Sequence, residues 1–303
     1  MSPREIKPNA TYLLTRRVLR RHTLLRPDAA ITQILLYVLA VSASRFGIEV
    51  HALCAMSTHV HLVVTDVHGV LPRFLHAFHR ITALCTKVLR KWEGPLWDPE
   101  HTSVVRLLTR EARVEKIAYV LANPVAAGLV EHARDWPGAK VDVGELGRGV
   151  LHAMRPEGYL DLENPLWPEQ ASLSLTLPPD VSPERAEDFC RDVAAELRRL
   201  EAEAHAEVAR QNLRFRGAEQ VRKVSPYDRA TSFEALRARN PTFAVGRDQK
   251  SARCAAAAAV TSFRASYRAA LEQWRARVHR VRNAVFPAGT WWMRVFHGAV
   301  VAV

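Results

Sequence analysis

The sequence predicts an α+β fold, a ferredoxin-like (split βαβ) antiparallel sheet with helices on one face, followed by a mostly helical C-terminal extension. Three observations predict it. Short segments rich in β-branched residues alternate with longer segments of helical periodicity in the first half. The first six segments run strand, helix, strand, strand, helix, strand, which is the order of a split βαβ unit. Past residue 150 the composition changes to prolines and then to long Ala-, Glu- and Arg-rich stretches.

The predicted strands are short runs of Val, Leu, Ile and Thr bounded by turn signals. The middle two are separated only by Ser57-Thr58, which indicates a hairpin. The four strands cover residues 10–20, 48–56, 59–66 and 103–108.

Three helices are predicted between and after these strands. Arg26-Pro27-Asp28 precedes a helical pattern that runs to about Phe46. A second pattern covers about 71–92 and stops at Gly94-Pro95, and a third covers about 113–122. Asn123-Pro124 is the expected end of the third helix, because a residue before proline disfavours the helical conformation.

The second half divides by composition. Residues 1–150 are expected to form the catalytic domain, 151–183 a proline-rich linker, and 184–303 a mostly helical region of unassigned role. Within that region the pattern predicts long helices over about 183–216 and 251–280, with irregular structure at 225–250. Residues 285–303 read as a turn followed by one or two strands.

The charge balance points to a polyanionic partner. The formal net charge is +12 and the pI is about 10.1, which favours nucleic acid first and an anionic membrane surface second. Basic residues peak at Arg16, Arg17, Arg20 and Arg21, which are candidates for phosphate or guide-base contacts. The alternative for these four is an ordinary solvated edge.

The spacing of the cysteines and the hydropathy of the sequence predict a location in the cytoplasm. The four cysteines are isolated and form no CxxC pair, which argues against a zinc knuckle and for free thiols in a reducing cytoplasm. No stretch resembles a signal peptide, and no run of eighteen apolar residues predicts a membrane span.

His59-Val60-His61 is the strongest local motif. Residues two apart on a strand point to the same face, so both imidazoles can reach one divalent cation. The alternative is a pair of histidines that hold no ligand, which a motif this short leaves open.

Tyr119 and Asn123 provide the second motif. They are four residues apart in a predicted helix and therefore share one helix face. The phenol is a candidate nucleophile, and the amide oxygen of Asn123 can complete a His-His-Asn metal site. A packing aromatic and a simple helix end are the alternatives.

These motifs together resemble the HUH single-tyrosine transposases, in the REP-associated tyrosine transposase branch. The resemblance covers about residues 8–138. It includes YLLTRRVLRRHTLLRPD, ALCAMSTHVHLVV, GPLW, YVLANPVAAGLV and DWPG, in that order.

The resemblance implies a transposase-like enzyme that cleaves and rejoins single-stranded hairpin or repeat DNA. Tyr119 would be the nucleophile of a 5′-phosphotyrosine intermediate, and His59, His61 and Asn123 would bind Mg²⁺ or Mn²⁺. It also implies a possible homodimer, association with the nucleoid when DNA is bound, and no membrane partner. One departure stands at His101-Thr102, where relatives carry an Arg-aromatic pair.

Three other functions compete with this interpretation. A domesticated protein would bind the hairpin without cutting it, an RNA-binding module would use the same layout, and a replication initiator or relaxase would share the histidine pair. His76, His79 and His101 are expected at the surface or in packing rather than as ligands. Trp291 and Trp292 are expected to pack or dock a domain, with base stacking as the alternative.

Overall fold

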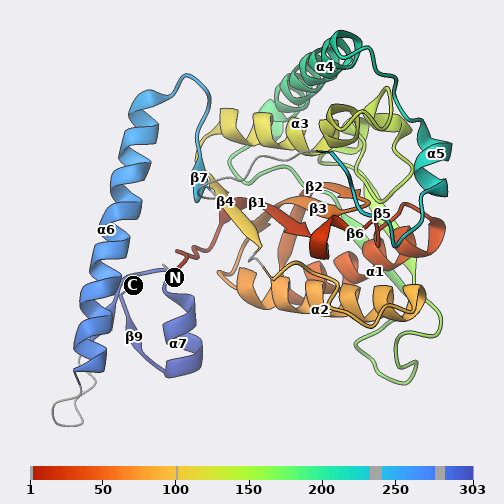
Figure 1. Ribbon diagram of the computed structural model, residues 1–303. Helices are drawn as coiled ribbons and strands as arrows, with labels where there is room; N and C mark the ends of the chain where they lie inside the picture. Colours follow the sequence, from red (N-terminus) through yellow and green to blue (C-terminus); the bar gives the residue numbers. More distant parts are fainter. Residues whose placement is uncertain (1–2, 100–101, 233–240, 277–283, 303) are drawn as a thin grey trace.

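The computed structural model describes residues 3–99, 102–232, 241–276 and 284–302 (Figure 1). His101 therefore lies outside the described residues. The N-terminal part forms one sheet with helices on both sides, and the C-terminal part extends from one edge of it (Figure 1).

The central sheet has five strands in the order β2-β3-β1-β4-β7. The first four strands pair antiparallel, with β1 and β3 in the middle, so the expected split βαβ topology is confirmed. The strand β7 adds to the outer edge, parallel to β4. The strands are β1 Ala10–Arg17, β2 Ile48–Met56, β3 His59–Asp66, β4 Ser103–Leu107 and β7 Phe243–Ala244.

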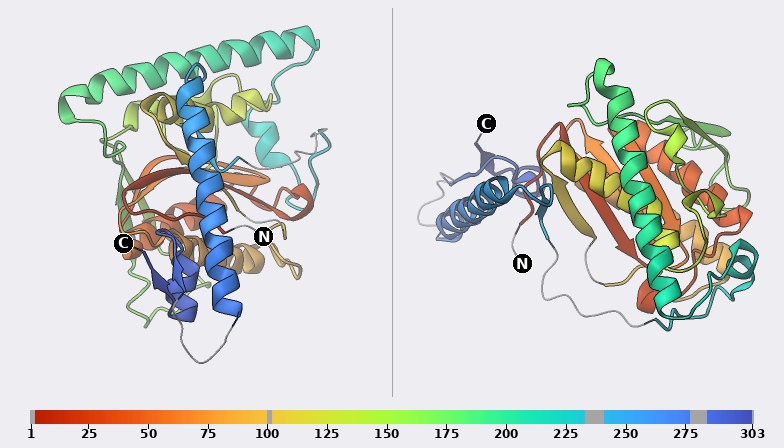
Figure 2. Two further views of the ribbon diagram at one scale, coloured as in Figure 1. Left: turned by 90° about the vertical axis from the view of Figure 1, so that its left-hand side faces the viewer. Right: turned by 90° about the horizontal axis from the view of Figure 1, so that it is seen from above.

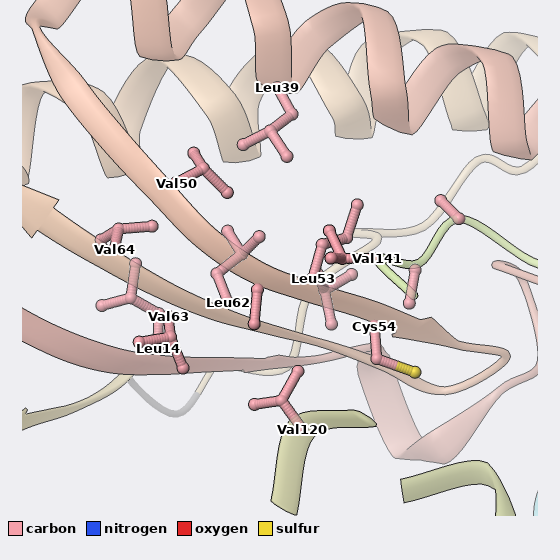
Figure 3. Packing of buried hydrophobic residues seen from close by; sticks show 14 of the residues in the cluster. Leu14, Leu39, Val50, Leu53, Cys54, Leu62, Val63, Val64, Val120 and Val141 are labelled. Atoms are coloured by element: carbon pink, nitrogen blue, oxygen red, sulfur yellow. The ribbon is translucent and has the colours of Figure 1, made fainter. Parts of the chain in front are cut away.

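Two helices cover one face of this sheet, as expected for the first six elements. They are α1 Ala29–Phe46 and α2 Leu71–Arg90. The opposite face is covered by α3 Arg110–Ala126, and α4 Ala186–Arg210 lies across α3 (Figures 1 and 2). Leu39 of α1 and Val120 of α3 approach the strands from opposite sides (Figure 3). The sheet is thus buried on both faces.

The helix α3 extends further than the sequence predicts. It continues through Pro124 to Ala126 instead of ending at Asn123-Pro124. Pro124 lies in the last turn, where the missing N–H removes one intrahelical bond, and the N–H of Ala127 still bonds the carbonyl of Asn123 at 3.0 Å. Asn123 is therefore held inside regular helix, one turn after Tyr119.

Residues 151–183, which the sequence predicts as a linker, carry ordered structure. The strands β5 Val150–Met154 and β6 Gln170–Ser174 pair antiparallel and pack on α1. The division of the chain into domains stays a prediction.

By length and hydropathy alone, α1 is the single helix in the described ranges that is able to span a membrane. Its mean hydropathy is 1.5 over 18 residues, and 50% of that window is buried inside the structure. Burial of that kind is also what a core helix shows, and α1 here lies between the sheet and the β5–β6 pair.

The C-terminal region is mostly helical, as predicted, but differs in its last segment. WWMRVFH forms a helix where strands were expected, and two-residue strands flank it. A separate small core that includes Phe286 and Met293 packs against α6. Figure 2 shows α6 standing at one side of the rest of the molecule.

The remaining helices and strands are α5 Ala218–Lys223, α6 Lys250–Arg275, β8 Val285–Phe286, α7 Trp291–His297 and β9 Val300–Val301. The short 3-10 turns are η1 Leu19–Arg21, η2 Ala133–Asp135, η3 Val143–Glu145 and η4 Pro183–Arg185.

A buried histidine joins β2 to the segment that follows β6. His51 lies at the bulge of β2, and its Nδ1 donates to the carbonyl of Thr176 at 2.8 Å. Its Nε2 accepts from the hydroxyl of Thr65 at 2.8 Å. Burial lowers the pKa of His51 from 6.5 to about 4, so the folded protein holds this imidazole neutral.

We expect His51 to make the protein less stable in mild acid. Between pH 6.5 and about 4 the unfolded chain binds a proton at this position and the folded chain does not. The free energy of unfolding therefore falls as the pH falls through that window, by about 3 kcal/mol in full from this group. Urea unfolding at pH 7 and pH 5 measures the change.

The substitution His51→Gln removes this contribution and should flatten the dependence on pH by about 2 kcal/mol between those two values. The exposed His152 provides the control, because His152→Gln should leave the dependence as in the wild type. If the free energy of unfolding falls equally with pH in His51→Gln and in the wild type, His51 is not the source of the acid sensitivity.

Candidate active site

The two histidines of the HxH motif lie side by side at the start of β3. Their ring centroids are 4.6 Å apart and the rings meet edge to face, at 88°. His61 is 3% exposed, while His59 is half-buried. The alternation along β3 thus places both imidazoles on the face of the sheet that α3 covers.

Each histidine is oriented by a threonine hydroxyl. Thr15 lies opposite His61 in the β1–β3 register, and its Oγ1 is 2.8 Å from His61 Nδ1. Thr58 Oγ1 is 2.9 Å from His59 Nδ1. The Nε2 atom of His61 is buried and has no hydrogen-bond partner within the described part of the chain.

His61 is held neutral by its surroundings. Burial lowers its pKa well below 6.5, and the neighbouring His59 and Arg17 lower it further. With its proton on Nδ1, donated to Thr15, the ring presents the lone pair of Nε2. A neutral imidazole with a free lone pair is the form that binds a metal ion.

Tyr119 and Asn123 reach this site from α3. The Tyr119 ring centroid is 5.5 Å from that of His61, and 39% of the tyrosine is exposed. Asn123 donates from Nδ2 to the carbonyl of Tyr119 at 3.0 Å. Its side chain also raises the pKa of His61, although no well-formed hydrogen bond reaches Nε2. The structure therefore brings together all four residues that the sequence singled out.

The donor set fits a divalent ion only if an amide completes it. No group of three or more His, Cys, Asp or Glu side chains suited to a metal occurs in the described ranges. Two imidazoles and the amide oxygen of Asn123 are donors that such ions accept. The buried, unbonded Nε2 of His61 is an atom that a metal would satisfy. The roles of His59, His61 and Asn123 as ligands stay a prediction.

The four arginines of the basic cluster do not form one surface. Arg17 lies opposite His59 in the register and faces the site. Arg16 points to the other face of the sheet, where its guanidinium lies 5.9 Å from the Trp97 ring. Arg20 is exposed on η1, and Arg21 donates to the backbone and hydroxyl of Ser232. Arg17 is therefore the member best placed to contact DNA at the histidine pair.

The remaining candidates behave as surface or packing residues. His76 is exposed, and His79 packs against Trp97 with ring centroids 5.4 Å apart. Trp291 is 7% exposed beneath Arg73, while Trp292 is 56% exposed and contacts Phe296.

A cavity behind Tyr119 is a feature that the sequence analysis missed. It is a half-open hollow of about 300 Å³, lined by α3, by α4, by the segment that leads into α6 and by the first turn of α6. The sequence holds no signal for it, because its walls come from three segments that are distant from one another along the chain. We call it the Tyr119 pocket, and its lining residues are Glu115, Lys116, Tyr119, Glu196, Leu200, Val245, Arg247 and Arg253.

Comparison with known proteins gives matches among solved structures only. No protein-family model matches the sequence, and no curated protein matches it significantly. A REP-associated tyrosine transposase bound to a REP hairpin is similar over 48% of this chain and 84% of its own, with 17% identity and a TM-score of 0.41. A putative transposase from Deinococcus radiodurans is similar over 36% of this chain and 87% of its own, with 25% identity and a TM-score of 0.29.

We expect Mn²⁺ to bind at the histidine pair, and the Thr15 hydroxyl to strengthen that binding. Groups that orient a metal-bound histidine typically change metal affinity by about ten- to a hundredfold. Thr15→Val should therefore weaken Mn²⁺ binding by about that factor, and His61→Ala should abolish it. Titration of free Mn²⁺ by electron paramagnetic resonance measures both.

Thr11→Val is the matched control for this titration. Thr11 lies on the same strand, but its hydroxyl bonds Thr65 at 2.8 Å and not a histidine. It should bind Mn²⁺ as the wild type does. Undiminished binding in His61→Ala would show that the metal is held elsewhere.

Proposed function

We propose that this protein is a transposase-like, metal-dependent DNA strand transferase that cleaves and rejoins single-stranded hairpin or repeat DNA through Tyr119. The observation that carries the proposal is the contact between Tyr119 and His61. A partly exposed phenol lies against a neutral histidine whose buried Nε2 has no partner within the described residues. Such a pairing serves chemistry on a bound phosphodiester better than it serves packing.

The reaction exchanges one phosphodiester for another. Tyr119 Oη attacks the scissile phosphorus and loses its proton, and a bond forms between that oxygen and the 5′ phosphate. The 3′ oxygen of the other fragment leaves with the bonding electron pair and is protonated to a 3′-OH. A 3′-OH from a second strand end then attacks the phosphotyrosine, which restores the phenol and rejoins the DNA.

The protein's own residues position the reacting groups. Thr15 and Thr58 fix the two imidazole rings, and the hydrogen bond from Asn123 to the Tyr119 carbonyl keeps the amide beside the phenol. A divalent ion such as Mg²⁺ or Mn²⁺, held by His59, His61 and Asn123, would polarise the phosphoryl oxygens and stabilise developing charge.

The electrostatics support DNA as the partner. The net charge of +12 favours a polyanion, and Arg17 faces the histidine pair from β1. A homodimer belongs to the same proposal. An RNA-binding role of the open-sheet kind is disfavoured, because within the described residues helices cover both faces of the sheet, where such modules stack bases (Figure 1).

Tyr119→Phe should abolish covalent capture of DNA. The protein is incubated with labelled single-stranded hairpins taken from repeats beside its own gene, with Mn²⁺ or with EDTA. Wild-type protein should form a denaturant-resistant adduct in Mn²⁺ only, because the phenol oxygen becomes bonded to phosphorus. Denaturing gel electrophoresis measures the adduct.

The control is Tyr227→Phe, which changes a tyrosine that is 50% exposed and whose hydroxyl donates to the carbonyl of Arg90 at 2.6 Å. It should form the adduct at the wild-type level. Tight and specific hairpin binding without any adduct would instead identify a domesticated binding protein. An adduct that persists in Tyr119→Phe would assign the nucleophile to another residue.

A further inference from the structure

We propose that the Tyr119 pocket binds a backbone phosphate of the DNA strand, with Lys116 and Arg253 as the cations that hold it. This inference rests on the proposed function and adds a binding site to it. It also gives the C-terminal extension a role, because Arg253 belongs to α6 and Lys116 to the tyrosine helix.

The wall that the extension contributes is firmly attached to α3. Gly246 donates from its backbone N–H to Thr109 Oγ1 at 3.2 Å, and Gln249 donates to Glu111 at 2.6 Å. A side chain at position 246 would clash, since a Cβ there would lie 2.7 Å from the Cβ of Glu111. The strand β7 extends the sheet just before this segment. The first turn of α6, which includes Arg253, is therefore held against α3 by these contacts.

The acidic residues of the pocket already have partners. Glu196 accepts two hydrogen bonds from Arg199, at 2.7 Å each, and a third from Arg247 at 3.1 Å. Glu115 accepts from the backbone N–H of Arg247 at 3.1 Å. Glu196 is therefore neutralised by Arg199 and by Arg247, which itself lines the pocket, while Glu115 has a backbone N–H as its partner.

Two cations of the lining remain without a carboxylate partner in the described residues. Lys116 Nζ lies 5.7 Å from the centre of the Tyr119 ring and is in no ion pair. Arg253 donates from Nη2 to the carbonyl of Arg247 at 3.2 Å, which uses one of the five donors of a guanidinium. Two cations without a carboxylate partner in the described residues, one on α3 and one on α6, line the same polar cavity and form a site for an anion.

The position of this site selects a DNA phosphate. Lys116 precedes Tyr119 by three residues, so both lie on one face of α3 with Tyr119 between Lys116 and His61. The histidine side of the tyrosine is assigned to the scissile phosphate. A neighbouring phosphate of the same strand would then enter the pocket on the other side and hold the strand across the phenol. The volume of about 300 Å³ accommodates a phosphodiester group.

The test is the salt dependence of single-strand binding by the full chain. Fluorescence anisotropy of a labelled oligothymidylate, measured in EDTA over a range of KCl concentrations, gives the slope of log K against log salt. Each phosphate contact to a single strand contributes about 0.7 to that slope. The pocket holds one phosphate, so the double variant Lys116→Gln/Arg253→Gln should lose about 0.7 of the slope, with weaker binding at low salt.

Two further variants make this result specific. Lys116→Arg/Arg253→Lys keeps both charges and should keep the wild-type slope. Arg222→Gln/Lys223→Gln removes two exposed charges from α5, on the opposite side of the molecule from α6 (Figures 1 and 2), and should also keep it. An unchanged slope in the pocket variant would overturn the inference, as would an equal loss in the α5 variant. Circular dichroism melts establish that all variants are folded.

Inorganic phosphate is the second probe. Stabilisation of the wild type by phosphate that disappears in the pocket variant, together with an unchanged oligothymidylate slope, would assign the pocket to a small anion and overturn the DNA assignment. Covalent capture separates this inference from the proposed function. If the wild type forms the covalent adduct but the pocket variant keeps the wild-type salt slope, the pocket inference alone is refuted. If the pocket variant has a reduced salt slope but the wild type forms no adduct on Tyr119, the proposed strand cleavage alone is refuted.

Discussion

The alternation of side chains along β3 is the constraint on which the site depends. It sends Val60, Leu62 and Val64 toward α1 and α2, and it sends both histidines toward α3. A shift of one residue in the β1–β3 register would exchange these faces and bury the imidazoles among aliphatic side chains. The same register sets Thr15 against His61, so the pairing that builds the core also orients the imidazole.

The helices on the two faces of the sheet contribute different residues to the structure. On one side α1 and α2 pack against the sheet, and His59, His61, Tyr119 and Asn123 all lie on the other side. On the other side α3 contributes Tyr119 and Asn123, and α4 and the segment before α6 enclose the outer surface of α3. In the function proposed above, a DNA strand that crosses α3 would pass Tyr119 between the histidine pair and the Tyr119 pocket, and would so contact both the first half of the chain and its extension.

Most of the first half could be predicted from the sequence, because its order depends on local periodicity. The strands and their hairpin follow from spacing within single elements, as do the His59–His61 and Tyr119–Asn123 pairs. That the two pairs form one group is implied by the resemblance of the motifs to a known family. The errors arise where tertiary packing decides. Pro124 stays helical because it sits in a terminal turn. Residues 150–154 and 170–174 form strands that pack on α1. The helix at 291–297 and the Tyr119 pocket depend on contacts between distant segments, which periodicity does not encode.

We propose that a divalent ion at the histidine pair lies beside Tyr119. Fluorine NMR of the protein with 3-fluorotyrosine at its six tyrosines tests it directly, with the Tyr119 resonance assigned from Tyr119→Phe. Stoichiometric Mn²⁺ should broaden that resonance beyond detection, because the ring centroid lies 5.5 Å from His61, and the same addition to His61→Ala should leave it sharp. A Tyr119 resonance that stays sharp while another tyrosine broadens would place the metal elsewhere and contradict the account.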